Sequence, residues 1–307
     1  MEAEIAEQAE RWPLVANAAA EQLRDFSPEF DLVVVAARGS SDNAALFARY
    51  LIEVHLGIPV SLAAPSVITK FHSSMRFGKA LVIGVSQSGA APDVAAVLEY
   101  AKGQGATTLS ISNHAGSLIT QFADRAVTLG VGEERSIAAT KTYSATLIAF
   151  LELVRQLGAA LPTVDTVPSD WFPRAADAAM DASGDVVRCQ PIFSLGRGYG
   201  FSTALESSLK LMECALIPSK AFSTADFEHG PKALAGPGSV AVSFDGAMPH
   251  LEEQGCLVVE APNSGVAAEI KPLTDIVFAQ YLALFAARAR GLDPDEARFL
   301  KKVTRTT

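Results

Sequence analysis

Short apolar runs alternate with segments of helical period along the whole chain. Each run ends in glycine or in small polar residues, which is typical of strands buried on both faces of a parallel sheet covered by helices. The predicted strands span residues 31–37, 60–63, 80–85, 107–112, 125–129, 191–195, 239–244 and 256–261. The predicted helices span residues 3–26, 42–55, 91–103, 118–123, 140–157, 171–183, 203–215 and 275–290.

Two stretches of the first half recur in the second half. VVVAARGSSDNAAL at 33–46 resembles IFSLGRGYGFSTAL at 192–205, and ALVIGVSQSG at 80–89 resembles SVAVSFDG at 239–246. Because both echoes come in the same order and at nearly the same separation, internal duplication is favoured over chance. The pattern therefore predicts two tandem α/β units joined by a helical link at 162–185.

Composition narrows the function classes. With 307 residues, 49% of them hydrophobic, the chain is long enough to bury two cores. A net charge of −9 argues against a broad nucleic-acid surface. The scattered cysteines Cys189, Cys214 and Cys256 suggest neither a disulfide framework nor a metal site. The acidic start is no secretory signal, and charges interrupt the most apolar window, 144–161, so we expect a cytoplasmic protein without a membrane span.

Small hydrogen-bonding residues follow two of the predicted strands. Ser86-Gln87-Ser88-Gly89 follows the strand at 80–85, and Gly39-Ser40-Ser41 follows the strand at 31–37. In an open parallel sheet, ligands bind beyond the carboxyl ends of the strands, where helix N-termini and hydroxyl groups hold oxyanions. No G-x-x-x-x-G-K-[ST] motif accompanies these clusters, so a sugar phosphate is favoured over a magnesium-bound nucleotide. The alternative is that Ser88 merely caps the following helix.

Six motifs in order resemble the paired sugar-isomerase (SIS) domains. They are ARGSSDNAALFARYL, SQSGAAPDV, EERSIAATKTYSA, LGRGYGFSTALESSLKLMECA, DFEHGPKAL and DPDEARFLKKVT. This pair forms the isomerase half of glucosamine-6-phosphate synthase and the smaller amino-sugar-phosphate deaminases. The resemblance implies two tandem SIS domains, each a flavodoxin-like three-layer sandwich with a parallel sheet flanked by helices. The implied boundaries are an N-terminal helical segment 1–28, domains 29–161 and 186–290, a linker 162–185, and a tail 291–307 that contributes to the active site.

The same resemblance implies roles for individual residues. The substrate- and phosphate-binding residues would be Gly39, Ser41, Ser86, Gln87, Ser88 and Ile137. The catalytic residues would be Glu213 for proton transfer, Lys210 as its neighbouring cation, His229 for ring opening in the partner subunit's site, and Lys302 in the tail. A homodimer with a shared site follows from the place of His229.

These residue types suit the chemistry. Converting an amino-aldose to a ketose requires ring opening and a proton shift between C1 and C2, which a histidine and a carboxylate perform without metal or cofactor. Structural alternatives remain for all four of the catalytic residues. Lys210 and Glu213 would form a surface ion pair, His229 would be a turn residue, and Lys302 would be a solvated terminal lysine.

The sequence departs from the synthase at two positions. Ala91 replaces a threonine that follows the serine turn, and Ala139 replaces a substrate-binding serine. The chain also starts in the sugar-binding unit, whereas the synthase begins with a glutaminase domain. We therefore expect an enzyme that deaminates and isomerises a hexosamine 6-phosphate and releases ammonia. The expected substrate is glucosamine 6-phosphate. The alternatives are a sugar-phosphate-sensing module, or an isomerase of a non-aminated or glycated sugar phosphate.

Overall fold

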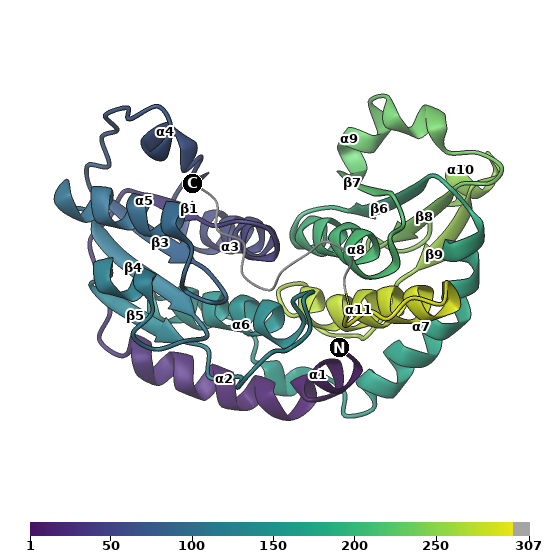
Figure 1. Ribbon diagram of the computed structural model, residues 1–307, viewed down its shortest axis with the longest axis horizontal. Helices are drawn as coiled ribbons and strands as arrows, with labels where there is room; N and C mark the ends of the chain where they lie inside the picture. The colour runs from purple at the N-terminus through teal and green to yellow at the C-terminus, as the bar shows by residue number, and fades with distance from the viewer. Residues whose placement is uncertain (297–307) are drawn as a thin grey trace. The chain divides into compact units, whose positions relative to one another are not determined.

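The computed structural model describes residues 1–296. The described chain divides into two compact units (Figure 1). The first unit comprises residues 10–134 and 141–161, and the second comprises residues 1–9, 135–140 and 162–296. Each unit contains one parallel sheet with helices on its faces, which confirms the predicted α/β class.

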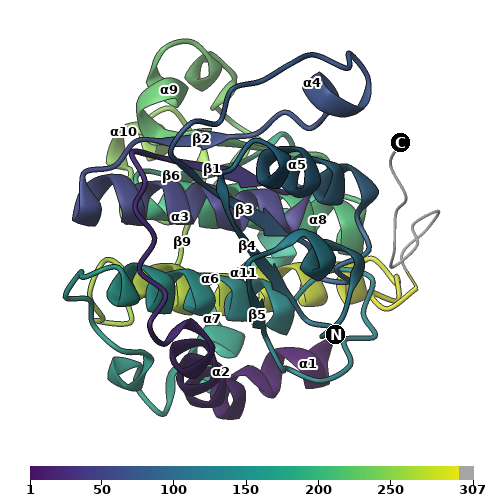
Figure 2. The same ribbon diagram turned by 90° about the vertical axis from the view of Figure 1, so that its left-hand side faces the viewer.

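The first unit has a five-stranded parallel sheet in the order β2-β1-β3-β4-β5 (Figure 2). Its strands are β1 Leu32–Ala36, β2 Val60–Leu62, β3 Ala80–Val85, β4 Thr107–Ser112 and β5 Arg125–Thr128. Its helices are α2 Gln8–Leu23, α3 Ser40–Leu56, α4 Ser66–Thr69, α5 Pro92–Gly103, η1 Leu118–Phe122 and α6 Lys141–Gln156. Helix α5 covers one face through a core that includes Val34, Val82 and Leu98, while α3 and α6 pack together on the other face.

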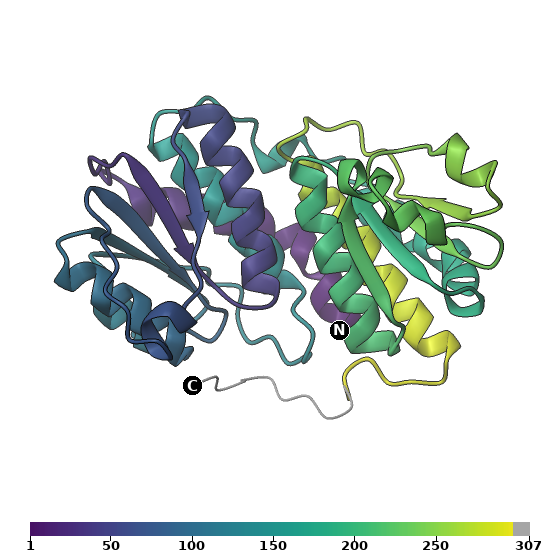
Figure 3. The same ribbon diagram turned by 90° about the horizontal axis from the view of Figure 1, so that it is seen from above.

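The second unit has a four-stranded parallel sheet in the order β7-β6-β8-β9. Its strands are β6 Ile192–Gly196, β7 Ser219–Ser223, β8 Val240–Ser243 and β9 Leu257–Glu260. Its helices are α1 Glu2–Ala6, α7 Trp171–Arg188, η2 Val164–Thr166, α8 Tyr199–Ala215, α9 Thr224–Glu228, η3 Pro231–Leu234, α10 Pro249–Glu252 and α11 Lys271–Ala289. Helices α8 and α11 lie side by side on one face (Figure 3). On the other face, Phe227 of α9 and Leu251 of α10 pack against Phe193 of β6.

Some predicted elements need correction. Strand β7 was not predicted, because SKAFS at an edge position keeps only Ala221 fully buried and therefore shows no apolar run. The single helix predicted at 3–26 is two helices, α1 and α2, with Glu7 between them. Helices α8 and α11 begin four residues earlier than predicted, at Tyr199 and Lys271. The periodicity of hydrophobic residues identifies the buried part of a helix but does not locate the first and last residues of the helix well.

The two units repeat the same strand–helix geometry. Helices α3 and α8 both have 17 residues and begin at Ser40 and Tyr199. The glycine before each helix has nearly the same backbone conformation, with φ 57° and ψ −132° at Gly39 and φ 57° and ψ −127° at Gly198. Only glycine adopts such a conformation readily. The structure thus supports the internal repeat that the sequence echoes indicate.

In residues 1–296, no helix is both long enough and apolar enough to cross a membrane.

Candidate active site

The loop Ser86–Gly89, called the serine loop below, follows β3 at the carboxyl edge of the first sheet. The side chain and backbone of Ser86 are 8% exposed, and its N–H donates to the carbonyl of Ile111 over 3.1 Å. The N–H of Gly89 donates back to the carbonyl of Ser86 over 3.0 Å, which closes a tight turn. Gly89 has φ 65°, and a Cβ there would lie 2.0 Å from Oγ of Ser117, so this position requires glycine.

Ser88 does not cap helix α5. The N-cap of α5 is Ala91, which has no capping side chain, and the helix begins at Pro92. The hydroxyl of Ser88 instead accepts a hydrogen bond from the N–H of Ala90 over 3.2 Å, within its own loop. The capping alternative is therefore wrong, and a role for Ser88 in binding stays a prediction.

The second serine cluster lies at the start of α3, where Ser40 and Ser41 are the first two helical residues. Strands β1 and β3 are neighbours in the sheet, so this helix start and the serine loop lie at the same edge, beyond adjacent strands. Arg38, just before the helix, donates through Nε to the buried carboxylate of Asp93 in α5 over 2.7 Å. This contact ties the α3 start to the helix that follows the serine loop.

Gln87 is held by a residue that the sequence did not single out. Its Nε2 donates to Oε2 of the buried Glu134 over 3.2 Å. The same carboxylate accepts hydrogen bonds from the N–H of Thr142 over 3.0 Å and from its hydroxyl over 2.7 Å, in the first turn of α6. Glu134 therefore fixes the orientation of the Gln87 amide. The place of Glu134 in EERSIAATK, just before a helix, did not indicate that it would bind Gln87.

In the second unit, α8 carries three charged residues along one face. Lys210 is fully buried, and its Nζ lies 2.5 Å from Oε2 of Glu213 and 3.2 Å from Oε1 of Glu206. Burial disfavours the charged form of Lys210, but the carboxylates of Glu206 and Glu213 more than offset this and raise its pKa above the usual range. Lys210 is therefore an ammonium at neutral pH. A surface ion pair, the alternative reading of this spacing, is wrong because the lysine has no exposed surface.

Glu206 was also missed by the sequence reading, although its spacing to Lys210 was visible in ESSLKLMECA. It is fully buried, whereas the side chain of Glu213 is 23% exposed. The lysine thus balances one buried carboxylate and leaves the other, Glu213, partly open to a ligand. Burial also raises the pKa of the adjacent Cys214 thiol to about 12, so this cysteine is no nucleophile at neutral pH.

The remaining predicted residues lie in several places. His229 is exposed at the end of α9, where its N–H donates to the carbonyl of Asp226 over 3.1 Å. Ile137 is half-buried in the segment 135–140, which belongs to the second unit and is anchored there by hydrogen bonds from Ser136 to the carboxylate of Glu4. Lys302 lies outside the described residues. The structure therefore places the serine clusters in the first unit and Glu213, His229 and Ile137 in the second.

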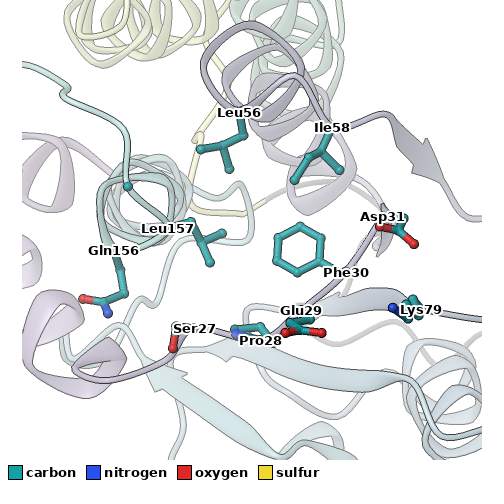
Figure 4. Close-up of a pocket in the computed structure, with 11 residues that line it drawn as sticks. Ser27, Pro28, Glu29, Phe30, Asp31, Leu56, Ile58, Lys79, Gln156 and Leu157 are labelled. Carbon is teal, nitrogen blue, oxygen red and sulfur yellow. The ribbon is translucent and has the colours of Figure 1, made fainter.

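A hollow of about 560 Å³ in the first unit is not this site. Asp31 and Lys79, which line it, precede β1 and β3 and so mark the amino edge of the sheet. Figure 4 shows apolar side chains gathered around it, among them Phe30, Ile58 and Leu157. The serine loop lies at the opposite edge, so this hollow offers positions for control variants rather than for catalysis.

Comparison with known proteins gives a family match. Residues 31–155 match the model of the SIS domain. The matched range contains both serine clusters and Gln87.

Two curated relatives carry the same enzyme name. The chain is 28% identical over 320 residues to glutamine–fructose-6-phosphate aminotransferase (isomerizing) of Pyrococcus horikoshii, covering 92% of this chain and 53% of that protein. It is 31% identical over 306 residues to the enzyme of the same name from Methanothermobacter thermautotrophicus, covering 89% and 51%. The chain spans about half the length of these curated relatives.

Solved structures share the fold over nearly the whole chain. The C-terminal domain of glucosamine-fructose-6-phosphate aminotransferase from Francisella tularensis aligns with a TM-score of 0.79 and 21% identity, covering 95% of this chain and 96% of that one. Glucosamine-6-phosphate deaminase from Thermotoga maritima aligns with a TM-score of 0.78 and 24% identity, covering 98% and 100%. At these identities the likeness shows a shared fold.

Proposed function

We propose that this chain is an amino-sugar-phosphate deaminase and isomerase that converts a hexosamine 6-phosphate into a ketose 6-phosphate and ammonia. The proposed substrate is glucosamine 6-phosphate. The observation that carries the proposal is the buried Lys210 paired with the partly exposed Glu213, a carboxylate kept beside a fixed cation. The names of the aminotransferase and deaminase relatives support the substrate class. We further propose that residues 186–290 form a second SIS domain after the first at 29–161.

In the proposed reaction, the serine loop and the start of α3 hold the phosphate. Ser86 and Ser88 donate through their hydroxyls, and the first N–H groups of α3 add donors at a positive helix end. Ser41 takes part through its place in the first turn of that helix. Gln87, whose amide nitrogen faces Glu134, contributes its remaining N–H and its carbonyl to the sugar.

The proton shift is assigned to Glu213. After His229 assists ring opening, Glu213 removes the proton from C2 of the open-chain amino-aldose, and C1 is then protonated. The resulting C2 imine takes up water and releases ammonia, which gives the ketose. The Lys210 ammonium donates a hydrogen bond to the Glu213 carboxylate over 2.5 Å and so holds the proposed base in place. Lys302 and the sharing of His229 between the subunits of a homodimer belong to the same proposal.

The test is a panel of phosphorylated sugars with two readouts. Glucosamine 6-phosphate, galactosamine 6-phosphate, N-acetylated hexosamine 6-phosphates and glucose 6-phosphate are incubated with the purified protein, and ammonia and ketose are measured. We expect equal amounts of ammonia and ketose from an amino sugar. Ketose from a non-aminated sugar without ammonia would favour the plain isomerase, and binding without either product would favour a sensing module.

A further inference from the structure

The second unit carries a carboxylate at the position that Ser86 occupies in the first. Strands β1 and β3 pair in the same register as strands β6 and β8. The corresponding pairs are Ala36 with Gly84 in the first unit and Leu195 with Ser243 in the second. Two residues beyond these pairs, the chain has Ser86 in the first unit and Asp245 in the second.

The position of Ser41 corresponds to a glycine next to that carboxylate. Counted from the first residue of α3 and of α8, Ser41 corresponds to Gly200. A Cβ on Gly200 would lie 3.5 Å from Oδ1 of Asp245, in van der Waals contact. The carboxylate of Asp245 therefore lies beside the position of the second unit that corresponds to Ser41.

The carboxylate of Asp245 accepts hydrogen bonds from the kinds of donor that would hold a bound anion. Its Oδ1 accepts a hydrogen bond from the N–H of Arg197 over 3.0 Å, and its Oδ2 accepts one from the hydroxyl of Thr224 over 2.9 Å. Arg197 precedes the glycine at the start of α8, as Arg38 precedes the glycine at the start of α3. A backbone N–H at a helix start and a hydroxyl are the usual donors to phosphate oxygens.

There is room at this edge of the second sheet. A hollow of about 310 Å³ opens beside Arg197 and Thr224, the two donors to Asp245, with Leu195, Phe227 and Met248 among its apolar lining. Asp245 thus accepts hydrogen bonds from two residues that line this hollow, and the carboxylate of Glu228 lines it as well.

We propose that Asp245 is an internal anion that occupies, in the second unit, the place of the phosphate in the first unit, and that it restricts the chain to one sugar phosphate. The correspondence with the first unit rests on the proposed role of Ser86. A phosphate entering the second unit would lose the N–H of Arg197 to Asp245 and meet a like charge at close range.

The direct test replaces Asp245 by serine in a chain that also carries Ser86→Ala and Ser88→Ala. Calorimetric titration with inorganic phosphate at constant ionic strength then reports on the second unit. We expect Asp245→Ser to bind phosphate about tenfold or more tightly than its parent, and phosphate to raise its Tm but not the parent's. Asp181→Ser, which removes an exposed carboxylate of α7, is the control for the change in net charge. A folded Asp245→Ser chain that binds phosphate no better than this control overturns the proposal.

A reciprocal exchange decides the matter even where Asp245→Ser does not fold. Ser86→Asp places the carboxylate in the first unit, and Ser86→Asn places a neutral side chain of the same size there. We expect Ser86→Asp to weaken glucosamine 6-phosphate binding about tenfold or more beyond Ser86→Asn. Equal binding by the two variants contradicts the proposal. If Ser86→Ala with Ser88→Ala leaves that binding unchanged, the proposed phosphate site is wrong, and the correspondence of Asp245 with the bound phosphate is wrong with it. The Asp245→Ser titration then reports separately whether Asp245 excludes phosphate from the second unit.

Discussion

Lys210 donates to Glu213 over 2.5 Å from a side chain that is fully buried, one helical turn before the carboxylate it pairs with. The same ammonium lies 3.2 Å from Glu206, so two carboxylates share one cation inside α8. Removing the cation would leave Glu206 buried with uncompensated charge, which is costly. Lys210 therefore has a structural role as well as an electrostatic one, and variants of Glu213 test the chemistry more cleanly.

Glu213→Gln keeps the shape of the side chain and removes the base. We expect kcat on glucosamine 6-phosphate to fall by about 10²-fold or more, with little change in substrate affinity and in Tm. Glu252→Gln, at an exposed carboxylate of α10, is the control and should leave kcat unchanged. Turnover of Glu213→Gln close to the wild-type rate would show that another group moves the proton.

Ser86→Ala and Ser88→Ala remove hydroxyl donors from the serine loop. Each should weaken sugar-phosphate binding by about 1–2 kcal/mol, the value of a lost charge-assisted hydrogen bond. Ser27→Ala makes the same chemical change at the opposite edge of the sheet, beside Pro28 in the hollow of Figure 4, and should leave affinity unaltered. Calorimetry that finds unchanged affinity in the double variant contradicts the phosphate assignment.

A shared site in a homodimer predicts complementation between inactive variants. His229→Ala removes the ring-opening group and Glu213→Gln removes the base, so a hybrid dimer would contain one site with both wild-type residues. Mixing the two inactive proteins under conditions of subunit exchange should restore part of the activity. Mass spectrometry establishes that hybrids have formed, and hybrids without activity count against a shared site.

Asp275 should make stability depend on pH. It is fully buried in α11, and burial, together with a smaller contribution from the nearby Asp245, raises its pKa to about 7 despite the ammonium of Lys271 at 2.5 Å. A raised pKa means that the folded protein binds this proton more tightly than the unfolded chain does. The stabilisation is complete below the unfolded pKa, about 4, and is lost as the pH rises to about 7.

Asp275→Asn removes this titration and keeps the size of the side chain. Urea denaturation between about pH 4.5 and about pH 8 should show that the free energy of unfolding falls as the pH rises. This fall should be steeper for the wild type than for Asp275→Asn. Asp181→Asn, at an exposed site, should follow the wild type. Parallel curves for wild type and Asp275→Asn would mean that Asp275 does not titrate in this range.

The repeat explains why one chain would use its two units differently. On α8, Glu206, Lys210 and Glu213 form the charged group, whereas the corresponding residues of α3 are Phe47, Leu51 and Val54. The first unit instead carries Ser41 and Ser86. Their counterparts in the second unit are Gly200 and Asp245. Each unit thus holds one part of the proposed machinery.

The sequence by itself determined the features that depend on local patterns. Apolar runs and helical period predicted the parallel strands, since a strand buried on both faces needs apolar residues at every position. The serine clusters after 80–85 and 31–37 were placed at strand ends, and Lys210 and Glu213 were placed one turn apart on a helix. Each of these statements follows from residues close together in the chain.

Only the tertiary structure decided the contacts that join distant residues. The burial of Lys210, the bond from Gln87 to Glu134, and the edge strand β7 all depend on how separate strands and helices pack, which spacing along the chain does not encode. The place of Asp245 depends on strand register, because a shift by one residue in the pairing of β8 with β6 would put another residue at the position that corresponds to Ser86. Asp245 became the counterpart of Ser86 only when β8 paired with β6 as β3 pairs with β1.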